Sequence, residues 1–470
     1  MTSTRLTLLA AMLAASPALA QQPVARVASA VRADTTLVPD SIPVTKKADS
    51  TVAAPKAPRL PRYEAPPVEI QHMRAADQRG VNVYESPKEE VVPFTGFRLS
   101  WGGAFTQQFQ NLTHSNTAAP RMVAGVNANS LIQIGSGFNT ANANLFMNVQ
   151  VAKGIRVAVE TYASSRHHNE TWVKDGYFLI DGSPIESALL DNIMKYVTLK
   201  VGHFEVNYGD THFRRSDNGQ TIYNPFVGNY IIDAFSTEIG AEAYLRSNGY
   251  MAMAGITGGE IKGQVTAPGI RGPTYLLKLG MDKQLADTRV RLTGSMYKTD
   301  RSANNTITSG DRAGSRYYDV LENTTSTEVA NAWSGAIQSG MRNMVTAFVV
   351  NPSIIYKNAE FYGNVETITG AAGTELERRT LRQLVGEGLY RFWDKKFYVG
   401  GRYNTVNGQL ANLPADINVQ RSQIGGGWYV TPNVLSKIEF VNQRYNNFPT
   451  TDIRNGGKFQ GFMVEGAVAF

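Results

Sequence analysis

From Phe94 onward, polar and apolar residues alternate, which is the pattern of β-strands with two different faces. The clearest case is Arg289–Tyr297, where Val290, Leu292 and Met296 fall on one face and Arg, Thr, Ser and Tyr residues on the other. The runs are roughly ten residues long, the length that a tilted strand needs to cross a membrane. The pattern therefore predicts membrane-spanning strands with an apolar and a polar face.

The runs predict about sixteen strands, a number that can enclose an aqueous channel when the sheet closes into a barrel. We expect them at 95–110, 140–152, 155–166, 171–180, 194–208, 234–246, 249–257, 273–283, 288–300, 345–356, 359–369, 380–392, 396–407, 417–430, 434–446 and 457–470. Short turns with Asn, Gly, Asp or Pro alternate with long loops. With both termini in the periplasm, the long loops, at 111–139, 209–233, 258–272, 301–344 and 447–456, are extracellular.

A soluble β-sandwich is the competing fold, because its strands also alternate. One face of the expected strands carries Glu360 and Glu366, and Glu387 and Arg391 follow on the next strand. Buried in a dry core, unpaired charges of this kind would cost several kcal/mol each. We therefore expect residues 94–470 to form a closed, transmembrane, antiparallel all-β barrel that is apolar outside and water-filled inside.

The first twenty residues predict export. Arg5 precedes a short apolar run, and Ala18-Leu19-Ala20 is a typical cleavage site, so residues 1–20 are expected to be a signal peptide. Residues 21–93 contain half of the chain's 20 prolines and few aromatic residues. This composition predicts a disordered, Pro-rich periplasmic segment, whose role is either a spacer or, through its basic part at 26–62, a contact with the cell wall.

The end of the chain predicts a partner and a location. Phe470 closes a strand in which Phe462, Val464 and Val468 fall on the same face. A terminal strand with alternating apolar residues and an aromatic end is the kind of signal that barrel-assembly machinery recognises. We therefore expect the barrel to be inserted in the cell outer membrane, among its lipids and lipopolysaccharide.

Composition excludes several classes of protein. The chain has no cysteine, so disulfides and thiolate metal sites are excluded, and its net charge of +7 favours anionic partners weakly. No nucleophile elbow, P-loop or dinucleotide motif is present, so we expect no enzyme activity, no cofactor and no nucleic-acid binding. His167, His168 and Glu170 resemble part of a metal site, but the sequence identifies no third ligand for them. No metal site is therefore predicted.

A resemblance adds to this interpretation. The segment Lys200–Gly209, with Gly202, Phe204 and Tyr208-Gly209, resembles an element of the phosphate-selective porins of the O/P type, and the preceding segment at 172–177 resembles that family's aspartate-containing strand. The resemblance implies a porin, in which a strand with this element leads into a loop that folds into the lumen.

The candidate pore residues follow from the loop and from the polar faces. In the loop, Arg214 and Arg215 opposite acidic residues would set a field across a constriction; the alternative is an ordinary solvated loop, or Arg–Asp pairs that only order it. Arg289 and Arg291 either attract anions near a periplasmic turn or pair with Asp282. The complete set of candidates is His212, Arg214, Arg215, Asp217, Arg289, Arg291, Arg156, Lys200, Glu387 and Arg391.

The expected function is passive diffusion of small hydrophilic solutes, with a mild preference for anions. A homotrimer is expected by analogy with general porins. The alternative is a structural barrel that ties the outer membrane to peptidoglycan or another envelope layer through its basic N-terminal segment.

Overall fold

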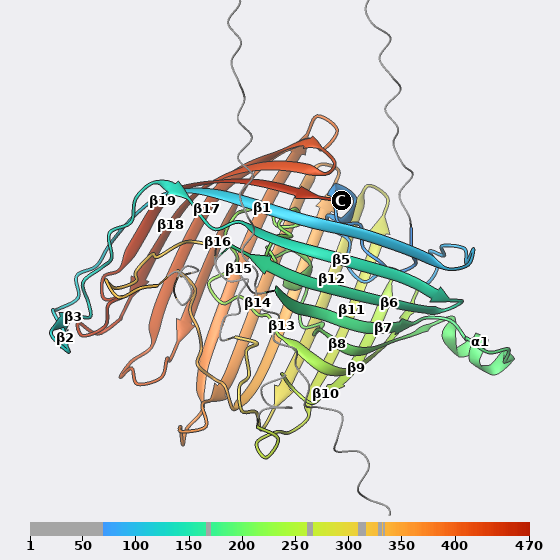
Figure 1. The fold of residues 1–470 in the computed structure, drawn as a ribbon, viewed down its shortest axis with the longest axis horizontal. Helices are drawn as coiled ribbons and strands as arrows, with labels where there is room; N and C mark the ends of the chain where they lie inside the picture. Colours follow the sequence, from blue (N-terminus) through green and yellow to red (C-terminus); the bar gives the residue numbers. More distant parts are fainter. Residues whose placement is uncertain (1–68, 166–170, 261–266, 309–315, 328–330, 332–333) are drawn as a thin grey trace, which may run out of the picture. The chain divides into compact units, whose positions relative to one another are not determined.

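The computed structural model describes residues 69–165, 171–260, 267–308, 316–327, 331 and 334–470. Its strands close into a ring, because β1 (Arg98–Ser115) pairs with β19 (Lys458–Ala469) on one side and with β5 (Asn142–Ala152) on the other. Figure 1 shows this closure, with β1 in blue lying beside β19 in red. A closed sheet has no free edge, which is the condition for strands in a lipid bilayer.

The wall consists of sixteen antiparallel strands, β1 and β5 to β19, each paired with its neighbour in the sequence. This confirms the predicted fold class and strand number. The remaining strands are β6 (Ile155–Ser164), β7 (Thr171–Ile180), β8 (Val197–Glu205), β9 (Thr237–Ser247), β10 (Tyr250–Thr257), β11 (Thr274–Leu285), β12 (Thr288–Thr299), β13 (Met344–Tyr356), β14 (Ala359–Ala371), β15 (Arg379–Phe392), β16 (Phe397–Gly408), β17 (Ile417–Thr431) and β18 (Val434–Asn446).

The short elements lie in the connections between these strands. A hairpin of β2 (Met122–Val123) and β3 (Val126–Asn127) and the short strand β4 (Gly137–Phe138) follow β1. The helix α1 (Ala188–Met194) lies between β7 and β8, and the Ser187 side chain caps it by accepting a hydrogen bond from the Leu190 amide. Within the described residues, no helix is long and apolar enough to cross a membrane.

The two faces of the wall follow the predicted alternation. In β12 the Leu292 side chain is 45% exposed on the outside, whereas Arg291 is 4% exposed on the inside. Neighbouring strands keep the same register, so that Leu292 lies opposite Met281 and Pro352. Because side chains alternate along a strand, one register places a whole row of apolar residues such as Met281, Leu292 and Pro352 on the same face.

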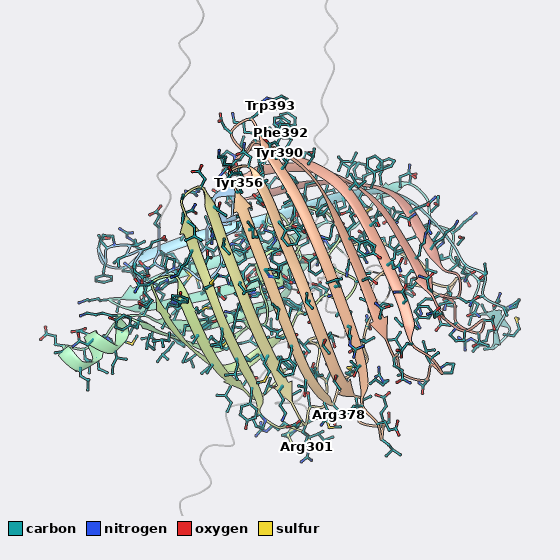
Figure 2. All side chains as sticks on the ribbon, turned by 180° about the vertical axis from the view of Figure 1, so that it is seen from behind. Arg301, Tyr356, Arg378, Tyr390, Phe392 and Trp393 are labelled. Carbon is teal, nitrogen blue, oxygen red and sulfur yellow. The ribbon has the colours of Figure 1, made fainter. Side chains whose placement is uncertain are left out.

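The outside of the barrel suits a lipid bilayer. Exposed apolar side chains such as Phe348 and Ile354 cover its middle. Figure 2 shows Tyr356, Tyr390, Phe392 and Trp393 at one end of the strands and Arg301 and Arg378 at the other. Aromatic side chains prefer the membrane–water interface, and apolar bands with aromatic borders are typical of outer-membrane barrels. The protein is therefore an outer-membrane β-barrel.

The connections differ between the two ends. The turns at the aromatic end are short, apart from the link that contains α1, and the chain's last strand also ends there. The long connections, including 206–236 and 300–343, all leave the other end, which we describe as extracellular. Phe462, Val464, Val468 and Phe470 share the outer face of the last strand, as predicted, and their role as an assembly signal remains a prediction.

The N-terminal part of the described chain requires a correction. Residues 69–93 were expected to belong to a disordered segment, but they lie in the periplasmic mouth, where their side chains bond to the wall. The physical reason is charge complementarity, since this stretch supplies the carboxylates and carbonyls that inward-facing cations need. We call residues 69–93 the plug. Residues 21–68 lie outside the described residues, and their periplasmic role remains a prediction.

Candidate functional site

The connection between β8 and β9, residues 206–236, lies inside the barrel, and we call it the lumen loop. Its Gly219 carbonyl accepts a hydrogen bond of 2.7 Å from the Thr106 hydroxyl on β1. On the far wall, the Ile231 amide donates to the Asn404 side chain of β16 at 2.6 Å. The loop therefore crosses the lumen, which is the arrangement that the resemblance of Lys200–Gly209 implied.

Charged wall residues hold the lumen loop in place. The buried ammonium of Lys437 donates to the carbonyls of Thr221, Asn224 and Phe226 at 2.9, 3.1 and 3.1 Å, and it pairs with Glu465 at 2.5 Å. On the same strand, the Glu439 carboxylate accepts from the amides of residues 227 and 228 at 2.8 and 3.1 Å. Backbone groups of a loop in a lumen need partners, and these side chains supply them.

The two arginines of the loop are paired. Arg214 donates to Glu387 on β15 and to Asn82 of the plug. Arg215 binds Asp233 at 2.5 Å and Asp217 at 3.0 Å. With exposed fractions of 5% and 3%, neither guanidinium faces open water. Arg215 thus makes the Arg–Asp pairs of one interpretation, and the field across a constriction remains a prediction.

Of the other two loop candidates, Asp217 is buried and His212 is partly buried. Asp217 binds the Lys174 ammonium of β7 at 2.5 Å. His212 bonds to the Asn207 side chain at 2.9 Å through Nε2. Burial, together with the nearby Lys278 ammonium, lowers the pKa of His212 well below its ordinary value, so the imidazole is neutral. Its contribution to a field in the lumen is therefore that of a dipole and not of a charge.

Arg289 and Arg291 project inward from β12, and both pair with Asp282. This pairing was one of the two roles considered for them, the other being the attraction of anions. The Arg289 pair is 2.6 Å long, and the Arg291 pair is 3.2 Å long. Arg291 also binds Asp210 of the lumen loop at 2.8 Å. Burial raises the pKa of Asp210, but Lys278 and Arg291 outweigh it and lower the pKa below its ordinary value, so the carboxylate is charged.

The remaining candidates lie along the inner wall. Arg391 binds Glu360 at 2.5 Å, and Glu387 binds Arg402 at 2.8 Å in addition to Arg214. Lys200 donates to the carbonyl of Glu205 at 3.2 Å. Arg156 pairs with Asp181 at the periplasmic end. The structure thus places every candidate pore residue on the inner side of the barrel, but it brings them together in local pairs and not in one ring.

Glu85 of the plug pairs with two cations of the wall. Its carboxylate lies 2.6 Å from Arg291 and 2.8 Å from the fully buried ammonium of Lys278 on β11. It also accepts from the Asn207 side chain at 2.7 Å. Burial raises the pKa of Glu85, but the two cations outweigh it and lower the pKa well below its ordinary value. The plug therefore brings a permanent negative charge into a cationic part of the lumen.

The plug contacts the wall and the lumen loop at other points. The Asn82 side chain donates to Glu360 at 3.0 Å, and the Gln78 amide donates to the carbonyl of Pro432 at 2.9 Å. Towards the loop, the Tyr223 hydroxyl donates to the Ala75 carbonyl at 2.6 Å, and the Arg74 guanidinium lies 3.4 Å from the centre of the Tyr223 ring. Side chains and single backbone groups make these contacts, and the plug does not pair with the wall as a β-strand.

At the periplasmic rim, His72 of the plug lies 3.0 Å from Asp181 through Nε2 and 2.5 Å from the Ser86 hydroxyl through Nδ1. Burial lowers the pKa of His72 to about 4, so the imidazole is neutral. Burial raises the pKa of Asp181, but the hydrogen bond from His72 and the charge of Arg156 lower it to about 2. The seated plug therefore depends on a neutral histidine beside a charged carboxylate.

Two cavities show how the lumen is filled. Between the lumen loop and the wall, a cavity of about 10 Å³ beside Tyr208, Glu366 and Gln383 holds no more than one water molecule. A second cavity of about 760 Å³ opens between the extracellular loops, beside Glu322 and Arg454. Backbone hydrogen bonds from Ile337 to Ile231 and from Phe235 to Ile307 join the 300–343 connection to the lumen loop. The lumen loop and the described part of the 300–343 connection therefore occupy part of the lumen.

Sequence reasoning missed several residues that fill the lumen: Glu85, Asp210, Lys278, Lys437 and Glu439. Lys278 lies between Leu277 and Leu279, and its inward position could have been found from the alternation alone. No pattern marks Glu85. His167, His168 and Glu170 lie outside the described residues, and no group of three or more His, Asp or Glu side chains able to hold a metal ion occurs in the part that is described.

Comparison with known proteins gives no family. No protein-family model and no curated protein matches the sequence. Among solved structures, the chain is similar to OmpT, an outer membrane protein of Vibrio cholerae, with 10% identity, 81% of this chain and 100% of that chain covered, and a TM-score of 0.48. It is similar to OprB of Pseudomonas putida, with 8% identity, coverage of 80% and 94%, and a TM-score of 0.48. For the outer membrane channel DcaP of Acinetobacter baumannii, the identity is 8%, the coverage 80% and 98%, and the TM-score 0.47. Likenesses this low carry no argument about what this chain transports.

Proposed function

We propose that this protein is an outer-membrane channel for small hydrophilic solutes, described here in a closed state with the plug seated in its mouth. The observation that carries the proposal is the place of Glu85, which neutralises Lys278 and Arg291 from a segment that is not part of the wall. Barrels of sixteen strands enclose a lumen wide enough for water. In this account the barrel needs no rearrangement of its strands to open at the periplasmic end.

The plug can leave because the wall does not depend on it. The ladder that pairs β1 with β5 and β19 begins after the plug, at Arg98. The plug is held by contacts of single groups, such as the amide of Gln78 on Pro432. When the plug leaves, buried ion pairs are broken. Hydration of the separated charges offsets part of the energy that is lost. The lumen loop stays behind as the constriction.

Release of the plug would leave an excess of positive charge in the lumen. Lys278 and Arg291 lose the carboxylate of Glu85, whereas Arg214 keeps Glu387 of the wall. The proposal therefore extends to a mild preference for anions, since cationic linings concentrate them. A relation to the phosphate-selective porins of the O/P type is part of the same proposal. It is supported by the motif at 200–209 and by the inward path of the loop that follows it.

The second candidate function is the structural barrel. It is favoured by the burial of the wall charges, because the side chains of Lys278, Lys437, Glu439 and Glu465 are fully buried in this conformation. A barrel that stays filled would serve as an anchor, with residues 21–68 as the proposed tether to peptidoglycan. The proposed homotrimer is compatible with both candidates and is measurable by light scattering in detergent.

Conductance in planar lipid bilayers separates the two candidates. We expect the wild-type protein to be closed most of the time, and a variant lacking residues 69–93 to show long, step-like openings. A variant lacking residues 24–66, which keeps the plug, is the matched control and should behave as the wild type. A correctly folded variant without the plug that conducts no ions would favour the structural barrel over the channel.

A further inference from the structure

The outer surface of β17, β18 and β19 changes character toward the extracellular end. Near the middle of the strands, Ile424, Phe440 and Phe462 form one apolar row across the three strands. The next two rows outward are polar, and we call their six residues the outer belt: Ser422, Asn442 and Gln460, then Gln420, Arg444 and Lys458. Because their neighbours in the sequence are buried in the lumen, these six side chains face away from the barrel.

Two cations of the outer belt lie directly opposite each other. Arg444 on β18 is paired in register with Lys458 on β19, and both side chains are exposed. Like charges at such positions destabilise a sheet. The outward residues of β17, β18 and β19, all of which the structure describes, include no carboxylate, and neither cation makes an ion pair within the described part of the chain. The pair therefore lacks a counter-charge, which an external anion would supply.

The neighbouring polar groups suit a saccharide. The Asn442 side chain donates to Gln460 at 3.0 Å, and further out the Asn446 side chain donates to Asn418 at 2.9 Å. Each of these carboxamides keeps free donor and acceptor capacity beyond the bond it makes. Carboxamides at exposed positions next to two cations form a surface for a ligand that carries both hydroxyl and phosphate groups.

The position along the membrane normal restricts the partner further. The outer belt follows the last apolar row on the extracellular side, where the headgroups of the outer leaflet lie. The opposite end has aromatic residues such as Tyr356 and Trp393, with Arg301 and Arg378 on the extracellular side (Figure 2). At the periplasmic end, the exposed Lys357 lies 3.8 Å from a counter-charge, Asp287.

We propose that the outer belt binds the phosphorylated saccharide headgroup of the outer-leaflet glycolipid, lipopolysaccharide. Arg444 and Lys458 hold one phosphate between them through charge-assisted hydrogen bonds. The carboxamides of Asn442, Gln460 and Gln420 bond to the adjacent sugar hydroxyls. This binding site is independent of the plug and of transport.

The test compares two double variants of the full-length, delipidated protein. R444Q/K458Q removes the paired cations, and K357Q/K396Q makes the same change of charge on exposed residues at the periplasmic end. With purified lipopolysaccharide as the probe, we expect R444Q/K458Q to bind roughly tenfold more weakly or worse, because each cation near an anionic headgroup contributes to binding. The control variant should bind as the wild type does. The heat-dependent shift of the folded barrel on gels confirms that both variants fold.

Three results would overturn the proposal. The first is an unchanged affinity of R444Q/K458Q for lipopolysaccharide. The second is equal binding of the wild type to phosphatidylglycerol vesicles, which offer the phosphate without the saccharide. The third is a change of oligomer size by light scattering in R444Q/K458Q while lipopolysaccharide binding persists, which would make the belt a contact between copies of the chain.

Discussion

The carboxylate of Glu85 lies 2.6 Å from the guanidinium of Arg291, although the two residues are 206 positions apart in the sequence. Glu85 belongs to the plug and Arg291 to the wall, so the bond joins the segment that we propose to be releasable to the barrel itself. Lys278 shares the same carboxylate at 2.8 Å. The energy of this one cluster therefore bears directly on whether the lumen is closed.

The first prediction concerns Glu85. In E85Q, Lys278 keeps Asp210, and Arg291 keeps Asp210 and Asp282, but both cations lose the carboxylate that the plug supplies. The seated plug is therefore destabilised by about 3–5 kcal/mol, the usual cost of breaking a buried pair. We expect a higher open probability in planar bilayers. Glu90, an exposed carboxylate of the same plug, provides the control variant E90Q, which should stay closed. Equal open probabilities in the two variants would show that the Glu85 cluster does not hold the plug.

The second prediction is a dependence on pH. Burial lowers the pKa of His72 to about 4 in the seated plug, whereas a released histidine has its ordinary value of 6.5. Between these values the released plug binds a proton that the seated plug does not, so the seated state loses stability as the pH falls from 6.5 toward 4. We expect openings to become more frequent over this range when the periplasmic side is acidified.

The control for the pH effect is H72Q, which removes the titrating group and should flatten the dependence. H114Q changes a histidine at the extracellular end, where β1 ends, and should keep it. Should H72Q retain the full response to acid, the titration would have to be assigned to another group.

The third prediction concerns ion selectivity. In the variant that lacks residues 69–93, Lys278 and Arg291 face the opened mouth without Glu85, and we expect the reversal potential in a KCl gradient to show a preference for chloride. Adding K278Q and R291Q should remove most of this preference. Adding K298Q, which changes a cation on the outside of β12, should not. A cation preference in the variant that lacks the plug would contradict the proposed field.

The fourth prediction concerns stability. Lys437 and Glu465 form a pair of 2.5 Å in which neither side chain is exposed, and Lys437 also bonds to three carbonyls of the lumen loop. K437M leaves the Glu465 charge buried without its partner, which should lower the free energy of unfolding by about 3–5 kcal/mol. Unfolding in urea, followed by the heat-dependent gel shift, measures this. K357M, at an exposed position, should unfold as the wild type does.

The strands could be predicted because their signal is local. β7 (Thr171–Ile180) and β18 (Val434–Asn446) have the predicted bounds, since the alternation stops where the turn residues begin. β1 was predicted to end at 110, but it continues to Ser115 because its pairing with β19 extends that far, which no local pattern in β1 reveals. Strand bounds thus follow from period and turns, except where a partner strand extends them.

The interior could be predicted only in part. The inward position of Arg291 and Glu387 follows from the alternation, but their partners follow from the register of distant strands and from the path of the lumen loop. Residues 69–93 were taken for part of a disordered segment, because proline content and few aromatic residues describe the composition of a stretch and not its partners. The contact of Glu85 with Lys278 spans 193 positions, and a single sequence carries no signal for it.

The most direct measurement of the central claim fixes the plug to the wall. The amide nitrogen of Gln78 and the carbonyl oxygen of Pro432 are 2.9 Å apart, so the backbones of these two residues are adjacent. Because the chain has no cysteine, the variant Q78C/P432C has only the two thiols introduced at these positions. Joined by a short, reducible cross-linker, the plug cannot leave, and each single variant treated alike is the control. We predict that the cross-linked barrel gives no conductance steps in a planar bilayer and that steps appear in the same membrane when the link is reduced. Steps of full size from the cross-linked barrel, or silence after reduction, would contradict the claim that the plug closes the channel.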